Sequence, residues 1–574
     1  MKTNKDERNR VFFLFIVIVI WALLIGSALV KVQVVDYNKN MAHVRKQRTR
    51  TFSLHPKRGA IYDSKGEVLA ISVKAKSAFL SNKNKQESLQ LFKRIRRKLR
   101  FHRDSNKNWS AVKDITRRIN AGKSFIWIKR KLSDDEYEKL SKIEIAPESK
   151  SQLNFLEEYK RIYPQGAMAA HVLGGVGIDE QGLAGIEFEL DSLIKGKGST
   201  VEVLLDARKK RFSQEFLTRP VPGKDIYLTI DSAVQFFVER ELKKTVLKYK
   251  AKSGAVIVMR SADGAILAMA GYPVYKPGAI CDTSSWKQKN RPVSFLYHPG
   301  STFKIVLAAT ALEKNVCYPQ QVFNCYNGVF PVKNQTIYDD HPAQKLTFEE
   351  IIIHSSNIGA ANIGLKLGKK RYYEGIKGFG FGAETGIRLP GEESGILRHV
   401  KNWSGVSVAF LAYGYELLVT PMQMVCAFNV PASGGYLVQP YVLARIAGEG
   451  PIKRKSARIL SPSTSSRLTS IMSRVVKLGT GKKAQIEGIE IAGKTGTTKK
   501  MKGKGTQRKY YVSSFGGFFP ARNPRVTIFV VIDEPSSAYY GGEVAAPLFR
   551  VIAQKLMVYL NIFPELYREN EVRI

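Results

Sequence analysis

Apolar residues form a long unbroken run near the N-terminus of the chain. Val11–Val30 reads VFFLFIVIVIWALLIGSALV, twenty residues without a charge. A helix of this length spans roughly 30 Å, which matches the hydrocarbon core of a bilayer. A cleaved signal peptide usually has a shorter apolar core, so the run predicts an uncleaved transmembrane anchor. Ala22 and Gly26 lie four residues apart, a spacing compatible with a partner helix or with a plain lipid-facing anchor.

After this run, short apolar segments alternate with dense charge. Lys83–Arg130 is basic and poor in long apolar runs, which is typical of a small extended or inserted subdomain. Near residue 221 the pattern changes. IYLTID (Ile226–Asp231) predicts a strand, and the apolar positions after it have the spacing of an amphipathic helix: Phe236, Val238, Leu242 and Val246.

Two hairpins are predicted in the second half of the chain. The first lies around Ala262-Asp263-Gly264, because Asp-Gly is typical of a tight turn between strands. The second joins Phe515–Pro520 to Val526–Asp533. A helix is expected after Pro547, with one apolar face made of Leu548, Ile552, Leu556 and Leu560. Together these patterns predict an α+β fold, in which a central antiparallel sheet is closed by distant segments and flanked by helices.

The chain is strongly basic, with 91 Lys and Arg against 49 Asp and Glu, a net charge of +42. This excess favours a polyanionic neighbour, which could be nucleic acid, an anionic membrane surface or an acidic wall polymer. A single span leaves the remaining chain on one side of the membrane. The chemistry described below favours the outside, which argues against nucleic acid. Both flanks of the span are basic, so charge alone orients it weakly.

The cysteines are sparse and contain no CxxC pair, so neither a structural zinc site nor a disulfide scaffold is expected. Cys317 and Cys325 are near enough in sequence to form a local bridge or to remain free. The other two are Cys281 and Cys426.

The first motif with chemical potential is Ser301-Thr302-Phe303-Lys304, which follows Pro-Gly and precedes the apolar run IVLAATAL. Ser301 is therefore expected at the N-terminus of a buried helix, where free N–H groups favour negative charge. Lys304 lies on the same face, and a buried lysine with a lowered pKa can take a proton from serine. The S-x-x-K spacing alone carries little weight, since it recurs without that context at Ser192/Lys195 and Ser284/Lys287.

Two further motifs follow in the chain. Ser355-Ser356-Asn357 offers a hydroxyl and a carboxamide that can relay a proton and bind a substrate amide, or can simply cap a helix. Lys494-Thr495-Gly496-Thr497 stands at the end of the strand-like IEIAG and offers a positive charge and hydroxyl donors for a carboxylate, or is an ordinary edge strand. The motifs S-x-x-K, S-x-N and K-T-G occur in this order in enzymes that transfer acyl groups through a serine. We therefore expect one cleft with Ser301 as nucleophile.

With these motifs the sequence resembles the class B penicillin-binding proteins. Pro56–Ala70, Arg161–Gly177 and Gly182–Asp191 look like the N-terminal boxes of that family, and KDIYLTID, HPGSTFK, HSSNIGAANIG and IAGKTGTT stand in family order. The similarity covers nearly all of the chain after residue 50 except the basic stretch around 83–160. The segments Gly378–Gly395 and Ala412–Gln423 look more like the division transpeptidase FtsI than the elongation enzyme.

The resemblance implies four parts: a cytoplasmic tail (1–10), a transmembrane helix (11–30), an extended β-rich pedestal domain (31–220) with the basic insert near 83–160, and a transpeptidase domain (221–574). It implies a single-pass protein of the cytoplasmic (inner) membrane with its catalytic domain outside. The implied partners are peptidoglycan stem peptides, a lipid-linked precursor, β-lactams as covalent inhibitors, an FtsW-like membrane glycan polymerase and division proteins. No cofactor and no metal are implied.

The resemblance also implies residue roles. Ser301 attacks a D-alanyl-D-alanine stem peptide with Lys304 as general base, Ser355 passes the proton to the leaving amine, and Asn357 orients the peptide. Lys494 adds electrostatic stabilisation beside Gly496, and Thr495 and Thr497 bind the terminal carboxylate. The backbone N–H groups of Ser301 and Thr497 face the oxyanion. An amine from a neighbouring stem completes the crosslink, in septal wall synthesis if the FtsI likeness holds.

Two departures from the family stand out. His298 occupies a place that is commonly acidic. A basic loop follows the K-T-G motif, either solvated or in contact with the pyrophosphate of a lipid-linked precursor: Lys499, Lys500, Lys502, Lys504, Arg508 and Lys509.

Two other functions fit part of the pattern. A D,D-carboxypeptidase or β-lactamase would use water as acceptor, but the N-terminal boxes and the large pedestal argue against a simple hydrolase. A non-enzymatic β-lactam sensor or division scaffold would not need the intact set of Ser301, Lys304 and Lys494, and the ten-residue tail is too short for a signalling domain.

Overall fold

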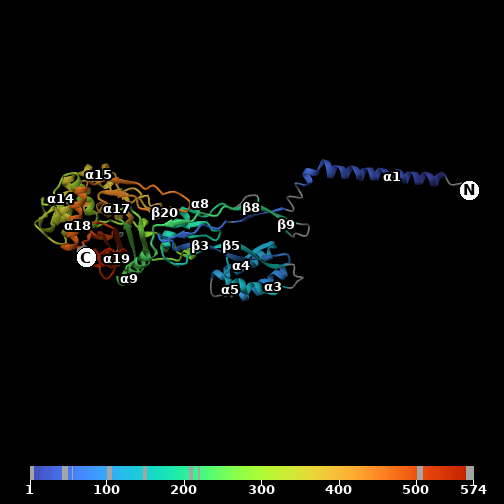
Figure 1. Ribbon diagram of the computed structural model, residues 1–574, viewed down its shortest axis with the longest axis horizontal. Helices are drawn as coiled ribbons and strands as arrows, with labels where there is room; N and C mark the ends of the chain where they lie inside the picture. The colour runs from blue at the N-terminus through green and yellow to red at the C-terminus, as the bar shows by residue number, and fades with distance from the viewer. Residues whose placement is uncertain are drawn as a thin grey trace, which may run out of the picture. The chain divides into compact units, whose positions relative to one another are not determined.

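The computed structural model describes residues 5–41, 49–54, 56–99, 106–145, 151–205, 211–216, 220–500 and 509–563 (Figure 1). The chain divides into two compact units, Met1–Lys57 with Gly196–Gly223 and Arg58–Lys195 with Lys224–Ile574. The stretch 31–220, predicted as one pedestal, is thus shared between the two units.

The first unit contains the apolar N-terminal helix. Helix α1 spans Lys5–Val30 and continues as a π-helical turn, Lys31–Val35. Its apolar side chains are exposed, and Glu7–Val35, with a mean hydropathy of 2.9, is long and apolar enough to cross a membrane. The predicted N-terminal apolar helix is therefore confirmed. The same unit holds an antiparallel sheet in the order β1-β8-β9, formed by Thr49–Leu54, Ser199–Leu205 and Arg211–Phe216.

In the second unit, a mixed sheet has the order β20-β10-β2-β3-β4, and β5 pairs with β3 along most of its length. Its strands are β2 (Ile61–Tyr62), β3 (Val68–Ser81), β4 (Phe125–Lys129), β5 (Gln152–Ile162), β10 (Ile226–Leu228) and β20 (Leu443–Ile446). Strand β10 is shorter than predicted, because the carboxylate of Asp231 already accepts hydrogen bonds from the first turn of helix α9 (Ser232–Lys248).

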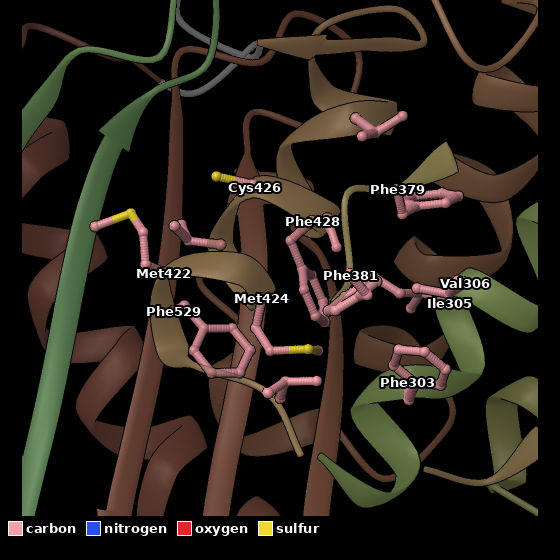
Figure 2. Close-up of a cluster of buried hydrophobic side chains, with 14 of the residues drawn as sticks. Phe303, Ile305, Val306, Phe379, Phe381, Met422, Met424, Cys426, Phe428 and Phe529 are labelled. Atoms are coloured by element: carbon pink, nitrogen blue, oxygen red, sulfur yellow. The ribbon is translucent and has the colours of Figure 1, made fainter. Parts of the chain in front are cut away.

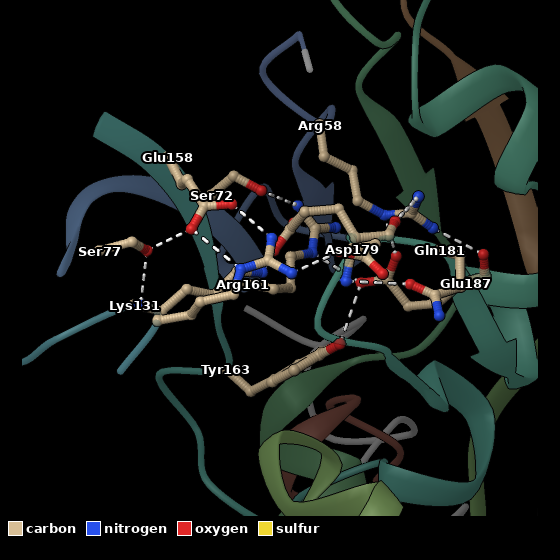
Figure 3. A network of polar contacts seen from close by, with 12 residues as sticks. Arg58, Ser72, Ser77, Lys131, Glu158, Arg161, Tyr163, Asp179, Gln181 and Glu187 are labelled. Carbon is tan, nitrogen blue, oxygen red and sulfur yellow. Dashed lines mark hydrogen bonds and ion pairs between the residues drawn. The ribbon is translucent and has the colours of Figure 1, made fainter. Parts of the chain in front are cut away.

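A buried ion network joins three of the N-terminal segments that resemble family boxes (Figure 3). Arg58 Nε lies 2.6 Å from Glu187 Oε2, and Arg161 Nε lies 2.6 Å from Glu187 Oε1. Arg58 also reaches Asp191 at 2.5 Å, and the hydroxyl of Tyr163 donates to Glu187 at 3.3 Å. Because removing one partner would leave a buried charge unpaired, this network fixes the three segments to one another.

The basic insert is a small α/β subdomain with its own core. Helices α3 (Lys85–Lys98), α4 (Asn106–Asn120) and α5 (Asp134–Ser141) pack with β3, β4 and β5. Their buried contacts include Leu91, Phe92, Ile95, Ile115 and Ile126. The sequence predicted an extended or inserted subdomain, and the structure shows a compact one.

The central sheet is antiparallel, in the order β12-β11-β24-β23-β22. Its strands are β11 (Ser253–Arg260), β12 (Ile266–Tyr272), β22 (Ala492–Lys500), β23 (Tyr510–Phe519) and β24 (Val526–Asp533). Both predicted hairpins are present, and Ser253 pairs opposite Asp533, so segments from the two ends of the domain lie side by side. The α+β prediction with a sheet closed by distant segments is confirmed.

Helices cover both faces of this sheet (Figure 1). Along β11, Val256 and Val258 face a core shared with α9 and α19 (Gly541–Tyr559), while Ile257 and Met259 face the core of the other helices. Helix α17 (Pro421–Ala432) packs against β24 on that second face, next to α18 (Pro462–Lys477). Alternate side chains of each strand therefore serve opposite cores, which explains the continuous apolar runs.

Helix α19 begins at Gly541, six residues before the predicted start at Pro547. Proline has no N–H, so the carbonyl of Glu543 loses the donor it would have inside a regular helix. The hydroxyl of Tyr249 donates to that carbonyl instead, at 3.0 Å. A side chain from a distant helix thus allows proline inside α19, which sequence spacing alone does not reveal.

The remaining helices are α6 (Ala170–Leu173), α7 (Gly185–Glu189), α8 (Asp191–Ile194), α10 (Ser285–Gln288), α11 (Arg291–Ser294), α12 (Lys304–Glu313), α13 (Phe348–His354), α14 (Asn357–Leu367), α15 (Lys369–Gly378) and α16 (Ser407–Ala412). Short strands complete the fold: β6 (Gly175–Val176), β7 (Gly182–Ala184), β13 (Val322–Asn324), β14 (Val329–Val332), β15 (Gln335–Tyr338), β16 (Lys345–Thr347), β17 (Ile396–Leu397), β18 (Leu417–Leu418), β19 (Tyr436–Val438) and β21 (Ser456–Arg458).

Candidate active site

Ser301 lies in a 3₁₀ turn, Gly300–Phe303, that leads directly into α12. Gly300 has φ of +55°, and a Cβ built on it would meet Thr498 Oγ1 at 2.3 Å. Only glycine fits both the left-handed backbone and the close approach to strand β22. The predicted position of the serine at a helix N-terminus is confirmed, and the turn is held against the K-T-G strand.

The helix behind Ser301 is fixed by a dense apolar core (Figure 2). Phe303 is fully buried and meets Phe381 edge-to-face at 5.0 Å between ring centres. Ile305 and Val306 from α12 join the same core, as does Phe428 from α17. Close packing of this kind allows the side chains only one arrangement. The turn that carries Ser301, called the nucleophile turn below, is therefore rigid.

Lys304 is completely buried at the start of α12. Its Nζ donates to Asn357 Oδ1 at 2.9 Å, to Ser355 Oγ at 3.3 Å and to the Ser355 carbonyl at 2.5 Å. Among the described residues, Ser301 Oγ makes no hydrogen bond of its own. Because catalytic hydrogen bonds often tighten only with substrate bound, the missing contact in the free protein is compatible with the expected proton transfer from Ser301 to Lys304.

The Ser355-Ser356-Asn357 segment caps a helix and also places polar groups beside the two buried lysines. Ser356 caps α14, because its Oγ accepts from Gly359 N at 2.9 Å. Ser355 has φ of +64° at the end of α13, and this left-handed backbone turns its hydroxyl and carbonyl toward the lysines. Asn357 starts α14 and directs its carboxamide at Lys304. The cap therefore positions the two side chains that could do chemistry.

Lys494 is the second fully buried lysine. Its Nζ donates to Ser355 Oγ at 2.9 Å and to the Thr495 carbonyl at 3.3 Å. The hydroxyl of Ser355 is thus shared by Lys304 and Lys494, which come from sequence positions far apart. The three motifs meet around one oxygen atom, as the sequence predicted.

The K-T-G motif lies within β22, which begins at Ala492, so the motif is part of the strand and not its end as predicted. Strand β22 is at the edge of the sheet. A Cβ at Gly496 would meet Ser514 Oγ at 2.6 Å, Thr302 Cγ2 at 2.8 Å and the Pro299 carbonyl at 3.0 Å. At this glycine, strand β22 therefore lies close to β23 and to the nucleophile turn.

The two threonines of the motif are oriented by their own hydrogen bonds. Thr495 Oγ1 lies 2.6 Å from Thr480 Oγ1, and Thr497 Oγ1 accepts from the backbone N–H of Gly541 at 2.8 Å. Since Thr497 Oγ1 is used as an acceptor there, its hydroxyl proton remains available to a ligand.

The pKa values of both lysines are depressed. Burial lowers the pKa of Lys304 to about 7, against the raising effect of the Asp339 and Asp340 carboxylates. Burial also lowers the pKa of Lys494 well below its ordinary value, and the neighbouring charge of Lys304 lowers it further. An amine with a pKa near 7 is present in both protonation states at neutral pH, which is what a general base and acid requires.

Asp339 is a site residue that the sequence reasoning missed. Its carboxylate accepts from the Ser356 hydroxyl at 2.5 Å, from Asn357 N at 2.5 Å and from Ile358 N at 3.1 Å. A carboxylate at the N-terminus of α14 satisfies free N–H groups and favours the helix dipole. It follows the β14–β15 hairpin, so only the tertiary fold places it there; no motif indicates it.

The other residues singled out earlier are also placed. His298 Nδ1 lies 2.6 Å from the Leu417 carbonyl, and its ring stacks on Tyr415. Lys500 pairs with Asp533 and Glu534, both at 2.8 Å, whereas Lys502, Lys504 and Arg508 lie outside the described residues. The two S-x-x-K decoys begin at four-residue helices, away from the lysine pair. Cys317 and Cys325 are both free thiols.

The family models and the relatives that match this chain all indicate the same protein family. Residues 254–554 match the penicillin binding protein transpeptidase domain, and residues 53–228 match the penicillin-binding protein dimerisation domain. Stage V sporulation protein D of Bacillus subtilis is 31% identical over 593 residues, covering 99% of this chain and 88% of that protein. Peptidoglycan D,D-transpeptidase FtsI of Escherichia coli is 29% identical over 518 residues, covering 88% and 84%.

A solved structure agrees with these relatives. Penicillin binding protein 3 from Mycobacterium tuberculosis, in complex with aztreonam, has a TM-score of 0.68 and 25% identity, covering 89% of this chain and 98% of that one. Two domain models in the order dimerisation then transpeptidase, relatives matched over nearly their full length and a shared fold all lead to one assignment. The chain belongs to the penicillin-binding protein transpeptidase family, as one of its class B members.

Proposed function

We propose that this protein is a peptidoglycan D,D-transpeptidase that crosslinks stem peptides through an acyl-enzyme on Ser301. The observation that carries the proposal is the meeting of two buried lysines on the Ser355 hydroxyl beside the Ser301 turn. A buried pair of cations is costly to keep, and it has a clear use where a proton must be taken and negative charge stabilised.

Acylation begins when Ser301 Oγ attacks the carbonyl carbon of the penultimate D-alanine and Lys304 Nζ accepts the hydroxyl proton. The backbone N–H groups of Ser301 and Thr497 stabilise the oxygen anion that forms. The tetrahedral intermediate then expels the terminal D-alanine as the C–N bond breaks. Both lysines donate to Ser355 Oγ, so the Ser355 hydroxyl proton is free to pass to the leaving nitrogen, and Lys304 replaces it with the proton taken from Ser301.

Asn357 and the K-T-G strand hold the substrate in this scheme. The amide nitrogen of Asn357 donates to the Tyr338 carbonyl at 3.0 Å, which fixes the carboxamide for contact with a peptide. Thr495 and Thr497 bind the terminal carboxylate next to Gly496, and Lys494 supplies positive charge near the reacting centre. Strand β22 contributes these groups from rigid backbone, so the binding geometry needs little rearrangement.

The acyl group then passes to an amine of a neighbouring stem peptide. That amine attacks the ester carbon, loses its proton to the Lys304–Ser355 relay, and releases Ser301 as the hydroxyl. The product is an amide crosslink, and the enzyme returns to its starting state. β-Lactams present a similar acyl group and would remain on Ser301, since their leaving group stays tethered.

The membrane arrangement follows from the substrate. We propose a cytoplasmic tail (1–10), a single span (11–30), a pedestal (31–220) and a transpeptidase domain (221–574) on the outer side of the inner membrane, where stem peptides are crosslinked. The exposed apolar helix α1 supports the anchor. Relatives named FtsI support a role in septal wall synthesis, with an FtsW-like glycan polymerase and division proteins as partners and a lipid-linked precursor as the source of new strands.

One experiment separates crosslinking from hydrolysis. Purified full-length protein is given synthetic pentapeptide stems with and without an acceptor amine. We expect D-alanine release together with a crosslinked dimer, and no dimer with Ser301→Ala. Release of D-alanine with no dimer at any acceptor concentration would assign the protein to the hydrolases instead. The Ser284→Ala variant, which alters a decoy serine, serves as the matched control.

A further inference from the structure

Helix α3 of the basic insert presents a ridge of positive charge. Lys93, Arg94, Arg97 and Lys98 are exposed, and Arg96 is partly buried. Among the described residues none of these five has a carboxylate partner; Arg94 donates only to the Glu144 carbonyl, at 3.4 Å. The catalytic scheme does not use this ridge.

The cations on the other side of the same subdomain are neutralised. Lys129 pairs with Glu136, and Lys131 pairs with Glu180. Arg130 bridges Glu158 and Asp179. Helix α5 adds two further pairs, Lys139 with Asp135 and Lys142 with Glu138. Among the described residues of the insert, α3 therefore carries the largest group of cations without a carboxylate partner.

The spacing on α3 makes this concentration unfavourable in the isolated protein. Lys93 with Arg97 and Arg94 with Lys98 are like-charge pairs at i,i+4, which repel each other on a helix surface. The dipole at the C-terminal end of α3 offsets part of this repulsion. Negative charge from outside the protein is needed to remove the rest.

Two grooves flank the ridge. One, of about 440 Å³, is lined by Arg94, Arg97, Lys98 and Lys142, with Glu144 as its only acidic lining residue. The other, of about 500 Å³, lies between α3 and α4 and contains Arg96, Lys113 and Arg117, the last paired with Asp114. In that second groove the cations of Arg96 and Lys113 each lie 5.6 Å from the ring centre of Trp109.

We propose that α3 and its two flanking grooves bind a linear polyanion with regularly spaced phosphate groups, of the sugar-phosphate or polyol-phosphate class. A chain can follow the cationic grooves on both sides of a ridge, whereas a flat bilayer would meet the ridge alone. The cations of Arg96 and Lys113, held over the Trp109 ring, add positive charge to the second groove.

The composition of the ridge argues against the two main alternatives. Of the apolar residues of α3 that could enter a bilayer, Leu91, Phe92 and Ile95 are buried in the core of the insert, and Leu89 is partly buried against that core. The same burial leaves α3 without the exposed apolar centre that a stable interface with another protein requires.

Binding of a fluorescent inorganic polyphosphate to the full-length protein in neutral detergent, followed by anisotropy, tests the proposal. Replacing three ridge cations (R94Q/R97Q/K98Q) should weaken binding by about tenfold or more and reduce the slope of log affinity against log salt by about 2–3. Glutamine preserves helix propensity, so α3 should still form.

The matched control removes the same charge from paired cations, K74Q/K76Q/K139Q, which contact Glu157 and Asp135. It should change the affinity by less than about twofold, since exposed paired cations attract a ligand weakly. Equal weakening by both triple variants would show that net charge alone matters and would overturn the site. Tighter, ridge-dependent binding to vesicles with anionic headgroups would replace the polymer with a membrane surface. Penicillin labelling should be unchanged in both variants, which shows an intact active cleft, and equal helix content by circular dichroism shows that α3 still forms.

Discussion

Lysine is used in opposite ways in the active cleft and on the basic insert. Lys304 and Lys494 are completely buried, share one serine hydroxyl and have lowered pKa values. The lysines of α3 are exposed to water and have no such partner among the described residues. In a chain with a net charge of +42, the rare buried lysine and not the abundant exposed one can act as a base.

The contrast shows what controls this chemistry. Removing an ammonium from water penalises its charged form, and the hydrogen bonds of Ser355 and Asn357 hold the amine in one geometry. An exposed ammonium keeps its charge and acts over distance on anions. Four experiments test this difference between the buried lysines of the cleft and the exposed lysines of the insert.

The largest effect is expected at the nucleophile. Ser301→Ala should abolish covalent labelling by a fluorescent penicillin, because the neighbouring hydroxyl of Thr302 is buried and donates to the Pro299 carbonyl. Gel fluorescence of the purified protein measures the adduct. Ser284→Ala should label normally. Persistent labelling of the Ser301 variant at the wild-type rate would move the nucleophile elsewhere.

The second prediction compares the acylation rates of two variants, each with one lysine replaced, one from the cleft and one from α3. Lys304→Met should slow acylation by roughly 10²–10⁴-fold, the usual contribution of a general base. Lys93→Met on α3 should leave the rate within about twofold, because an exposed surface cation has no part in the transition state. Stopped-flow acylation with a chromogenic β-lactam gives both rates. Similar losses in the two variants would remove the distinction between the regions.

The pH dependence of the acylation rate should reveal the lowered pKa of Lys304. Burial lowers the Lys304 pKa to about 7, so the amine loses its proton as the pH rises through that value. Only the neutral amine can accept the Ser301 proton. Acylation should therefore rise about tenfold per pH unit below 7 and level off above it, with apparent values that belong to the coupled lysine pair. A rate that keeps rising to pH 10 would mean that the base is an unperturbed amine.

The smallest effect concerns the carboxylates near the cleft. The charge of Asp340 raises the Lys304 pKa, so Asp340→Asn should move the midpoint of the acylation profile below 7. Because Asp340 is exposed, water screens most of its charge and the shift should be small. Asp135→Asn, on the insert, should leave the midpoint unchanged. An upward shift for Asp340→Asn would contradict the assigned sign.

Much of the site could be predicted because its parts carry local signals. A Pro-Gly turn before an apolar helix placed Ser301, and the order of the three motifs indicated their convergence. The segment around Lys494 was harder, since AGKTGTT has little strand propensity and was interpreted as following a strand. It is a strand because β23 pairs with it along its length, with Lys494 opposite Gly516.

Other features had no local signal at all. Asp339 reaches the S-x-N motif only after the β14–β15 hairpin has folded. Pro547 is tolerated in α19 because Tyr249, nearly three hundred residues earlier, donates to Glu543. The sequence predicted an extended or inserted subdomain, but the compact core of the insert depends on contacts with β3 and β5 on both sides of it. Long-range contacts of this kind are not encoded in short windows of sequence.

Strand β22 ends the central sheet, and this position has a consequence for what the cleft can discriminate. The main-chain groups on its outer side have no neighbouring strand, so an incoming extended peptide can complete the ladder as a further strand. Recognition would then depend mainly on amides and carbonyls, which every residue shares. Such a cleft would accept stems that differ in side chain, and with the proposed carboxylate contacts of Thr495 and Thr497 it would reject stems that lack a free carboxyl end.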